Sequence, residues 1–169
     1  MTIAQQITLD YEDEMNSTRK ILERVPLDDA HRGFKPHPKS MALDRLATHI
    51  AELPAWPKMA LDSETFELAV DFTPRIVSSS AELMEIFEQS VEAGRACLAA
   101  ATDEEMSKNW TFKYGSFVSF SSPRTKVIRS FINHLVHHRA QLGVYLRLNE
   151  IPLPGMYGPT SDERAAMAR

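Results

Sequence analysis

The stretch Asn133-His134-Leu135-Val136-His137-His138-Arg139-Ala140-Gln141 decides how the rest of the chain is interpreted. It lies within residues Pro123 to Asn149, where apolar side chains recur at intervals of three and four and predict an amphipathic helix. Because His134 and His138 are four residues apart, they lie one turn apart on one helix face, with Cβ atoms roughly 5–6 Å from each other. Two imidazoles at that separation can bind one divalent metal ion.

The neighbours of this histidine pair have other expected roles. His137 points about 100° away around the helix and is interpreted as a packing, interface or surface residue. Gln141 and Tyr145 continue the histidine stripe and could orient a ligand or a water, although Tyr145 could equally fill core volume. Arg139 is expected to form a salt bridge or to cap backbone carbonyls. Ser122 and Pro123 match the N-cap and first position of the helix.

Two helices are predicted in the N-terminal part of the chain. Thr2 and Gln5 match a capping box that opens a helix from about Ile3 to Arg24. After a loop that contains His31 and His37, Ser40 is expected to cap a second helix. The apolar stripe of this second helix is interrupted by a further histidine, His49.

The middle of the chain predicts a break, a connection and a third helix. Pro54 and Pro57 should weaken or kink the second helix at its far end. Residues Leu61 to Ser78 lack sustained periodicity and predict a long connection with room for a short extended segment. Ser79 and Glu82 then match a second capping box, which opens the third helix.

The next segment is short and aromatic. Thr102 and Glu105 predict a brief helix, after which Trp110 to Phe120 alternates aromatic and polar residues and could form a strand or an extended flap. Trp56 and Trp110 are interpreted as core or pocket-wall residues. With four long amphipathic helices and little strand signal, the sequence predicts an all-α fold, a four-helix bundle with long connections. Residues 1–169 are expected to form one domain, with an ordered tail from Met156 that ends in polar residues.

Composition excludes several classes of function. The net charge of -4 and the pI near 5.9 argue against a nucleic-acid-binding surface, because phosphate binding depends on clustered Lys and Arg. No apolar run approaches the length of about 20 residues needed to span a bilayer, so we expect no membrane partner and a cytoplasmic location. Cys97, the only cysteine, lies in an apolar helical stretch and is interpreted as a buried, inert thiol.

A third histidine from a facing helix would complete a metal site. Neutral imidazole binds Zn²⁺, Ni²⁺, Fe²⁺ or Cu²⁺, and His49 together with the His134–His138 pair would leave coordination positions open for water or substrate. The zinc-protease helix has a Glu immediately after its first His, whereas Leu135 follows His134 here. That difference counts against a peptidase of this class.

Longer motifs identify a family. The chain contains, in this order, Leu46-Ala47-Thr48-His49-Ile50-Ala51-Glu52-Leu53, Asn133-His134-Leu135-Val136-His137-His138-Arg139-Ala140-Gln141-Leu142, Tyr145-Leu146-Arg147, Pro152 and Tyr157-Gly158-Pro159-Thr160-Ser161-Asp162-Glu163. These motifs span nearly the whole chain and resemble the DinB family, also called DinB/YfiT-like. One departure is Ala140, where the family pattern usually has Gly; a methyl group there affects helix packing but removes no metal ligand.

The resemblance implies a four-helix bundle, often dimeric, that carries a divalent metal ion (Zn, Ni or Fe) on three histidines, here His49, His134 and His138. It does not imply DNA synthesis, because the family name reflects damage-inducible expression. Related members resemble metal-dependent hydrolases, thiol S-transferases or isomerases that use a low-molecular-weight thiol, and many have no assigned activity. A homodimer with a small-molecule or thiol substrate is therefore expected.

Two functions of different classes follow. In the first, the protein is an enzyme whose metal ion activates a bound water or thiol near neutral pH. In the second, it is a non-catalytic stress-response protein whose bundle the ion stabilises. A nearby carboxylate would favour the enzyme, and Glu52 is the closest candidate in sequence for a general base. The sequence assigns no catalytic residue beyond this candidate.

Overall fold

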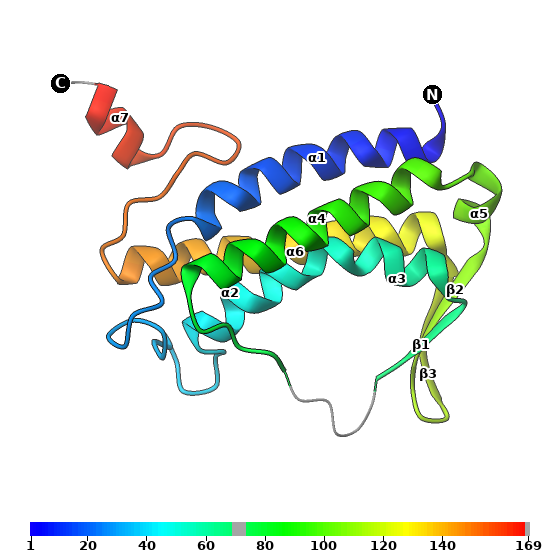
Figure 1. The fold of residues 1–169 in the computed structure, drawn as a ribbon, viewed down its shortest axis with the longest axis horizontal. Helices are drawn as coiled ribbons and strands as arrows, with labels where there is room; N and C mark the ends of the chain where they lie inside the picture. Colours follow the sequence, from blue (N-terminus) through cyan, green and yellow to red (C-terminus); the bar gives the residue numbers. More distant parts are fainter. Residues whose placement is uncertain (69–73, 168–169) are drawn as a thin grey trace.

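The computed structural model describes residues 1–68 and 74–167. These residues are mostly helical, with one small three-stranded sheet at an end of the molecule (Figure 1). The elements are α1 (Ile3–Leu22), α2 (Leu43–Glu52), the 3₁₀ helix η1 (Leu53–Ala55), α3 (Trp56–Asp62), β1 (Thr65–Glu67), α4 (Ser80–Ala100), α5 (Asp103–Ser107), β2 (Asn109–Tyr114), β3 (Phe117–Pro123), α6 (Arg124–Leu148) and α7 (Ser161–Met167).

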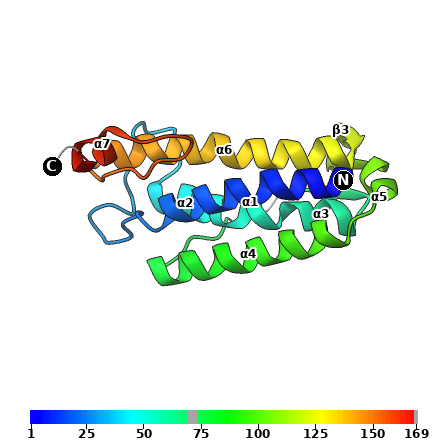
Figure 2. The same cartoon turned by 90° about the horizontal axis from the view of Figure 1, so that it is seen from above.

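The long helices run side by side along the molecule. Helix α1 packs against both α4 and α6, and the segment formed by α2, η1 and α3 packs against the same two helices (Figure 2). One apolar core lies between them, and among its fully buried members are Tyr11, Leu46, Ile50, Phe87, Leu98 and Trp110. Within the described residues, no helix is both long and apolar enough to cross a membrane.

Side-chain caps confirm three of the predicted helix starts. The Thr2 capping box is present in full, with both of its reciprocal hydrogen bonds. The Ser79 hydroxyl accepts a hydrogen bond of 3.2 Å from the Glu82 amide. The Thr102 hydroxyl accepts one of 3.2 Å from the Glu105 amide. Each of these caps satisfies an amide that would otherwise lack a partner in the first helical turn.

Two predicted caps are wrong, and in both cases distant backbone replaces the side chain. Helix α2 begins at Leu43 without a side-chain cap, and its Leu43 and Asp44 amides bond to carbonyls of the preceding loop, while Ser40 lies in a turn. Ser122 lies in β3 opposite Trp110, so α6 begins only at Arg124, whose amide donates to the Lys108 carbonyl. The strand therefore continues directly into the helix.

The C-terminal tail contains a helix that the sequence analysis did not predict. Helix α7 begins after Thr160. The Thr160 hydroxyl accepts a hydrogen bond of 3.2 Å from the Glu163 amide, and the Glu163 carboxylate accepts one of 3.1 Å from the Thr160 amide. This is a capping box with the same spacing as the one at Thr2. Arg147 of α6 ties the tail down through an ion pair with Asp162. Residues 168–169, in the predicted polar end, lie outside the described residues.

The small sheet corrects the all-α prediction. Strands β2 and β3 form an antiparallel hairpin where the sequence predicted a strand or a flap, and β1 adds to β2 in parallel, with Phe66 opposite Phe112. The short extended segment expected between residues 61 and 78 is β1, although residues 69–73 of that connection lie outside the described residues. The molecule thus combines a helical body with a small sheet.

The predicted break after α2 is held by a buried tyrosine. The chain leaves α2 at Glu52, passes through η1 and continues as α3, as the two prolines of this region predicted. The Tyr11 hydroxyl of α1 lies 3.0 Å from the Pro54 carbonyl oxygen and 3.1 Å from that of Val91 in α4. A Cβ atom at Gly94 would overlap both the Tyr11 hydroxyl and the Pro54 oxygen, so only glycine fits there.

Replacing this glycine should destabilise the fold. We expect Gly94→Ala to lower the free energy of unfolding by about 2 kcal/mol or more, because the new methyl group would overlap the Pro54 oxygen and displace the buried Tyr11 hydroxyl from its hydrogen bonds. Urea denaturation measures the change.

Gly143→Ala is the matched control for this change. A Cβ atom there would meet only the Ile21 side chain at an ordinary 3.8 Å, so better helix propensity should stabilise α6 by up to about 1 kcal/mol. Equal stability of the two variants would show that the contact at Gly94 imposes no constraint.

Candidate metal centre

Three histidines from two helices meet in space. His49 comes from α2, whereas His134 and His138 come from successive turns of α6. The Nε2 atoms of His49 and His134 are 3.2 Å apart, and the His138 ring centre lies 4.8 Å from that of His49 and 4.4 Å from that of His134. One nitrogen from each ring can be chosen so that all three lie within 4.8 Å of one another. This group could hold a metal ion.

The spacing and the hydrogen bonds fit a divalent ion. Nitrogen ligands bind zinc at 2.0–2.1 Å in a tetrahedron, which places two of them about 3.3–3.4 Å apart. The His49–His134 distance is close to this value. His138 Nδ1 lies 2.8 Å from the Gln141 amide oxygen, and donation of its proton there leaves Nε2 with a free lone pair. Gln141 therefore orients the imidazole of His138, a candidate metal ligand. The sequence had indicated that Gln141 could orient either a ligand or a water.

Burial keeps these imidazoles neutral. Desolvation, together with the smaller effects of the nearby His138, Arg45 and His134, lowers the pKa of His49 to about 3. Desolvation also lowers the pKa of His134 and of His138. Neutral imidazole is the form that binds metal ions. Within residues 1–68 and 74–167, no carboxylate or thiol joins this group of candidate ligands.

A large pocket opens beside the histidines. It has a volume of about 920 Å³, and its walls come from α2, α3, α4, α6 and the sheet. His49 and His134 line it, while His138 is buried behind them. Trp56 of α3 stacks on His134 with ring centres 5.5 Å apart and meets His49 edge to face at 5.7 Å. An ion on the three histidines would therefore be reached from the pocket.

Comparison with known proteins agrees with this geometry. A model of the DinB family matches residues 2–167. The chain belongs to the DinB family. A DinB-like protein from Bacillus cereus shares its fold with a TM-score of 0.69 at 21% identity, covering 90% of this chain and 97% of the other. A DinB-like protein from Bacillus subtilis has a TM-score of 0.67 at 18% identity, covering 92% and 99%. A search of curated proteins finds no significant match.

Other histidines of this DinB chain lie outside the group. His137 is exposed, with its ring centre 5.0 Å from that of His138, as its position on the helix predicted. His31 bonds to Asp28 in the loop before α2, and His37 is exposed in the same loop. Ala140, the departure from the family pattern, is also exposed.

The polar residues near the centre have different roles. Glu52 lines the pocket, where its carboxylate lies 3.5 Å from the Arg45 guanidinium. Arg139 is buried and bonds to the Glu14 carboxylate and carbonyl, which confirms the predicted salt bridge and carbonyl cap. Tyr145 is a core residue whose hydroxyl donates to the Met41 carbonyl.

Cys97 is half-buried in α4, and burial raises the pKa of its thiol to about 11. An uncharged thiol is a poor nucleophile, which agrees with the interpretation of Cys97 as inert.

Part of the pocket was not predicted from the sequence. Phe66 received no role, because β1 is only three residues long and gives no alternation to detect. Trp56 and Trp110, in contrast, were interpreted from the sequence as core or pocket-wall residues, and both line the pocket. Trp56 follows His49 by seven residues, or about two helical turns, and so returns to the same face. The alternation of Trp110, Phe112 and Tyr114 likewise places three rings on one face of a strand.

The metal-free protein should lose stability in mild acid. His49 has a pKa of about 3 in the folded protein and the ordinary 6.5 when unfolded, so the unfolded chain binds more protons below pH 6.5. This loss begins as the pH falls below 6.5 and continues down to about pH 3. We expect the urea midpoint of chelator-treated protein to fall between pH 7 and pH 5, and His49→Gln to reduce that fall.

His37→Gln, a substitution in the exposed loop before α2, is the matched control for the removal of one histidine. An identical pH dependence in His49→Gln and the unchanged protein would contradict the assignment of this effect to His49.

Proposed function

We propose that this chain binds one divalent metal ion through His49, His134 and His138 and is a metal-dependent enzyme, either a hydrolase or a low-molecular-weight-thiol transferase. The observation that carries the proposal is the meeting of three neutral imidazoles, two of which line a pocket of about 920 Å³. Zn²⁺, Ni²⁺ and Fe²⁺ all accept such nitrogen ligands. Family membership supports the same reading.

The donor set supports an open coordination sphere. Three imidazoles give fewer than the four to six contacts that these ions prefer, and no other acidic or thiol group of the described residues joins them. His49 and His134 face the pocket, so water or a substrate atom can reach the remaining positions from there. Structural zinc sites, in contrast, are closed by four protein ligands.

The residues around the site would divide the chemistry between them. When bound, a divalent ion supplies a Lewis acid that lowers the pKa of a water or thiol ligand. Trp56 fixes the His134 ring by stacking, and Gln141 fixes the His138 ring by accepting its proton. We assign Glu52 as the group that accepts a proton within the pocket, while Arg45 holds its carboxylate in place.

A second candidate is a non-catalytic stress-response protein that the ion only stabilises. The coupling of metal binding to folding would support it, since the ligands come from two helices. The pocket favours the enzyme, because a purely structural ion needs no cavity of about 920 Å³ beside two of its ligands.

Metal content tests the ligand assignment. We expect His49→Ala, His134→Ala and His138→Ala each to reduce the bound divalent ion sharply, because each removes one of three donors. Elemental analysis of the purified variants measures the content. His137→Ala, on the same helix and exposed, is the control and should retain the ion. Full occupancy in His49→Ala would exclude the site formed by α2 and α6.

Activity separates the two candidates. We expect the metal-loaded protein to turn over at least one substrate in screens of ester or amide hydrolysis and of thiol transfer. Glu52→Gln should lower that kcat by at least about tenfold at unchanged metal content, because it removes the proton acceptor. Glu85→Gln, which changes an exposed carboxylate of α4, should not lower it. Absence of metal-dependent turnover in both screens would favour the non-catalytic protein.

A further inference from the structure

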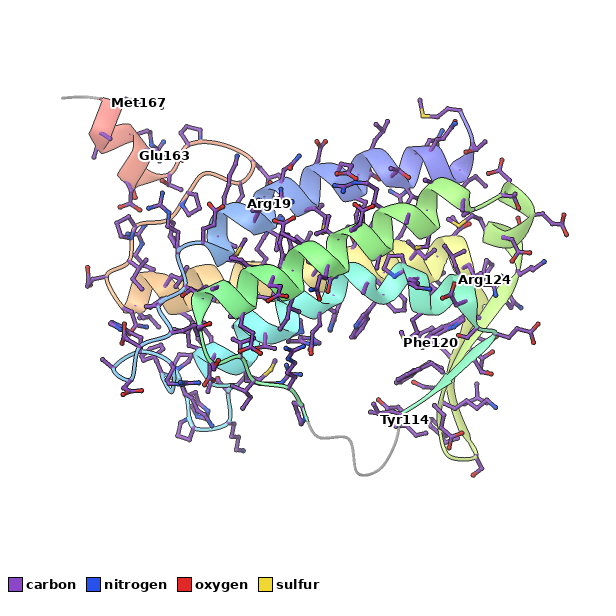
Figure 3. The ribbon with its side chains drawn as sticks, viewed as in Figure 1. Arg19, Tyr114, Phe120, Arg124, Glu163 and Met167 are labelled. Atoms are coloured by element: carbon purple, nitrogen blue, oxygen red, sulfur yellow. The ribbon has the colours of Figure 1, made fainter. Side chains whose placement is uncertain are left out.

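Aromatic rings of the sheet and of the helices line the pocket. The sheet contributes Phe66, Phe112, Tyr114 and Phe120, and the helices contribute Trp56 and Phe131. Figure 3 shows Tyr114 and Phe120 extending from the same side of the sheet. These side chains come from all three strands and from two helices, so the wall exists only in the folded molecule. Most of the pocket surface is apolar as a result.

The rings of the sheet are arranged as a layer. Phe66 and Phe112 are nearly parallel, with centres 5.9 Å apart, and Phe112 and Phe120 are 5.8 Å apart at 28°. Tyr114 meets Phe112 edge to face at 4.9 Å. Phe112 is opposite Phe120 in the hairpin, so the antiparallel pairing itself aligns the two rings. Yet Phe120 and Tyr114 remain 40% and 49% exposed, which leaves ring surface available to a ligand.

The charges around the pocket are already paired within the protein. Arg45 faces Glu52 at 3.5 Å, and Arg75 bonds to Glu82 at 2.9 Å. A ligand with a charge on its ring system, away from the candidate metal centre, would have to compete with these partners and would lose its own hydration in apolar surroundings. An uncharged ligand meets neither cost.

We propose that the substrate of this site is an uncharged aromatic compound whose ring system lies between the sheet layer and Trp56, beside the three histidines. This inference rests on the proposed function, because it places the ligand's reactive end next to the metal centre. The pocket volume of about 920 Å³ accommodates a compound of two to three rings. Stacking of aromatic faces supplies attraction beyond that of burial alone.

A matched pair of probes tests the claim about charge. N-phenyl-1-naphthylamine is uncharged, and 1-anilinonaphthalene-8-sulfonate adds one sulfonate to the same rings. Both tryptophans of the chain line the pocket, so energy transfer from them to a bound probe reports occupancy of this place. We expect the uncharged probe to bind at least tenfold more tightly. Tighter binding of the sulfonate, or no transfer from either probe, would overturn the proposal.

Substitutions in the hairpin test the location. Phe120→Ala should weaken binding of the uncharged probe at least fivefold, and Phe112→Ala should act in the same direction. Phe117→Ala removes a ring of the same strand that is 66% exposed and does not line the pocket, and it should change binding less than twofold. Circular dichroism confirms folding of each variant, and Phe120, being partly exposed, tolerates truncation best. Equal weakening by Phe117→Ala would place the probe on the outer surface and overturn the proposal.

The measurement separates this inference from the proposed function. Probe binding is measured on the protein as purified and again after chelation of any metal ion. Binding in both samples supports the aromatic pocket even if metal analysis of the histidine variants fails. Conversely, if the protein binds a metal ion but neither probe, the proposed metal centre stands and the proposal of an aromatic substrate is rejected.

Discussion

The buried Tyr11 hydroxyl is the contact on which the arrangement of the site depends. It lies between the Pro54 carbonyl of η1 and the Val91 carbonyl of α4, in space that Gly94 leaves free. Proline lacks a backbone N–H and interrupts the helical hydrogen bonding of this buried segment. Tyr11 ties the interrupted segment to α1 and α4. After the break the chain continues as α3, whose first residue, Trp56, stacks on His134 of α6.

Protonation of the candidate metal centre is electrostatically unfavourable in the metal-free protein. Three imidazoles are packed together without a carboxylate among them. Burial opposes protonation of each, and repulsion from nearby histidines and, for His49 and His138, from Arg45 adds to this effect. A cation bound by the three nitrogens gains from the same neutrality, because no proton has to be displaced near neutral pH. Because the three imidazoles carry no extra proton near neutral pH, their nitrogen lone pairs are available to a cation.

Local signals made much of the helical body predictable, while contacts distant in sequence were not. Thr2, Ser79 and Thr102 act within three residues of themselves, so their capping was visible in the sequence. Ser40 and Ser122 had the same local chemistry, but loop carbonyls and strand pairing took precedence over it. The parallel pairing of β1 with β2 joins residues more than forty positions apart, and three residues give no period to detect. His134 and His138 were predictable from helical spacing, whereas the placement of His49 beside them followed from the family resemblance.

Strand β3 continues directly into α6, and this junction lies between the candidate metal ligands and the aromatic layer of the pocket. The candidate ligands stand on helices of the body, whereas the aromatic layer stands on a hairpin that leaves this body at one end (Figure 1). Arg124 anchors the joint, since its guanidinium bonds to the Ser63 carbonyl and the Glu105 carboxylate. Substitutions in the hairpin change the pocket wall on strands that carry none of the three histidines. The hairpin is in this sense an exchangeable module, through which one helical framework can be adapted to ligands of different size.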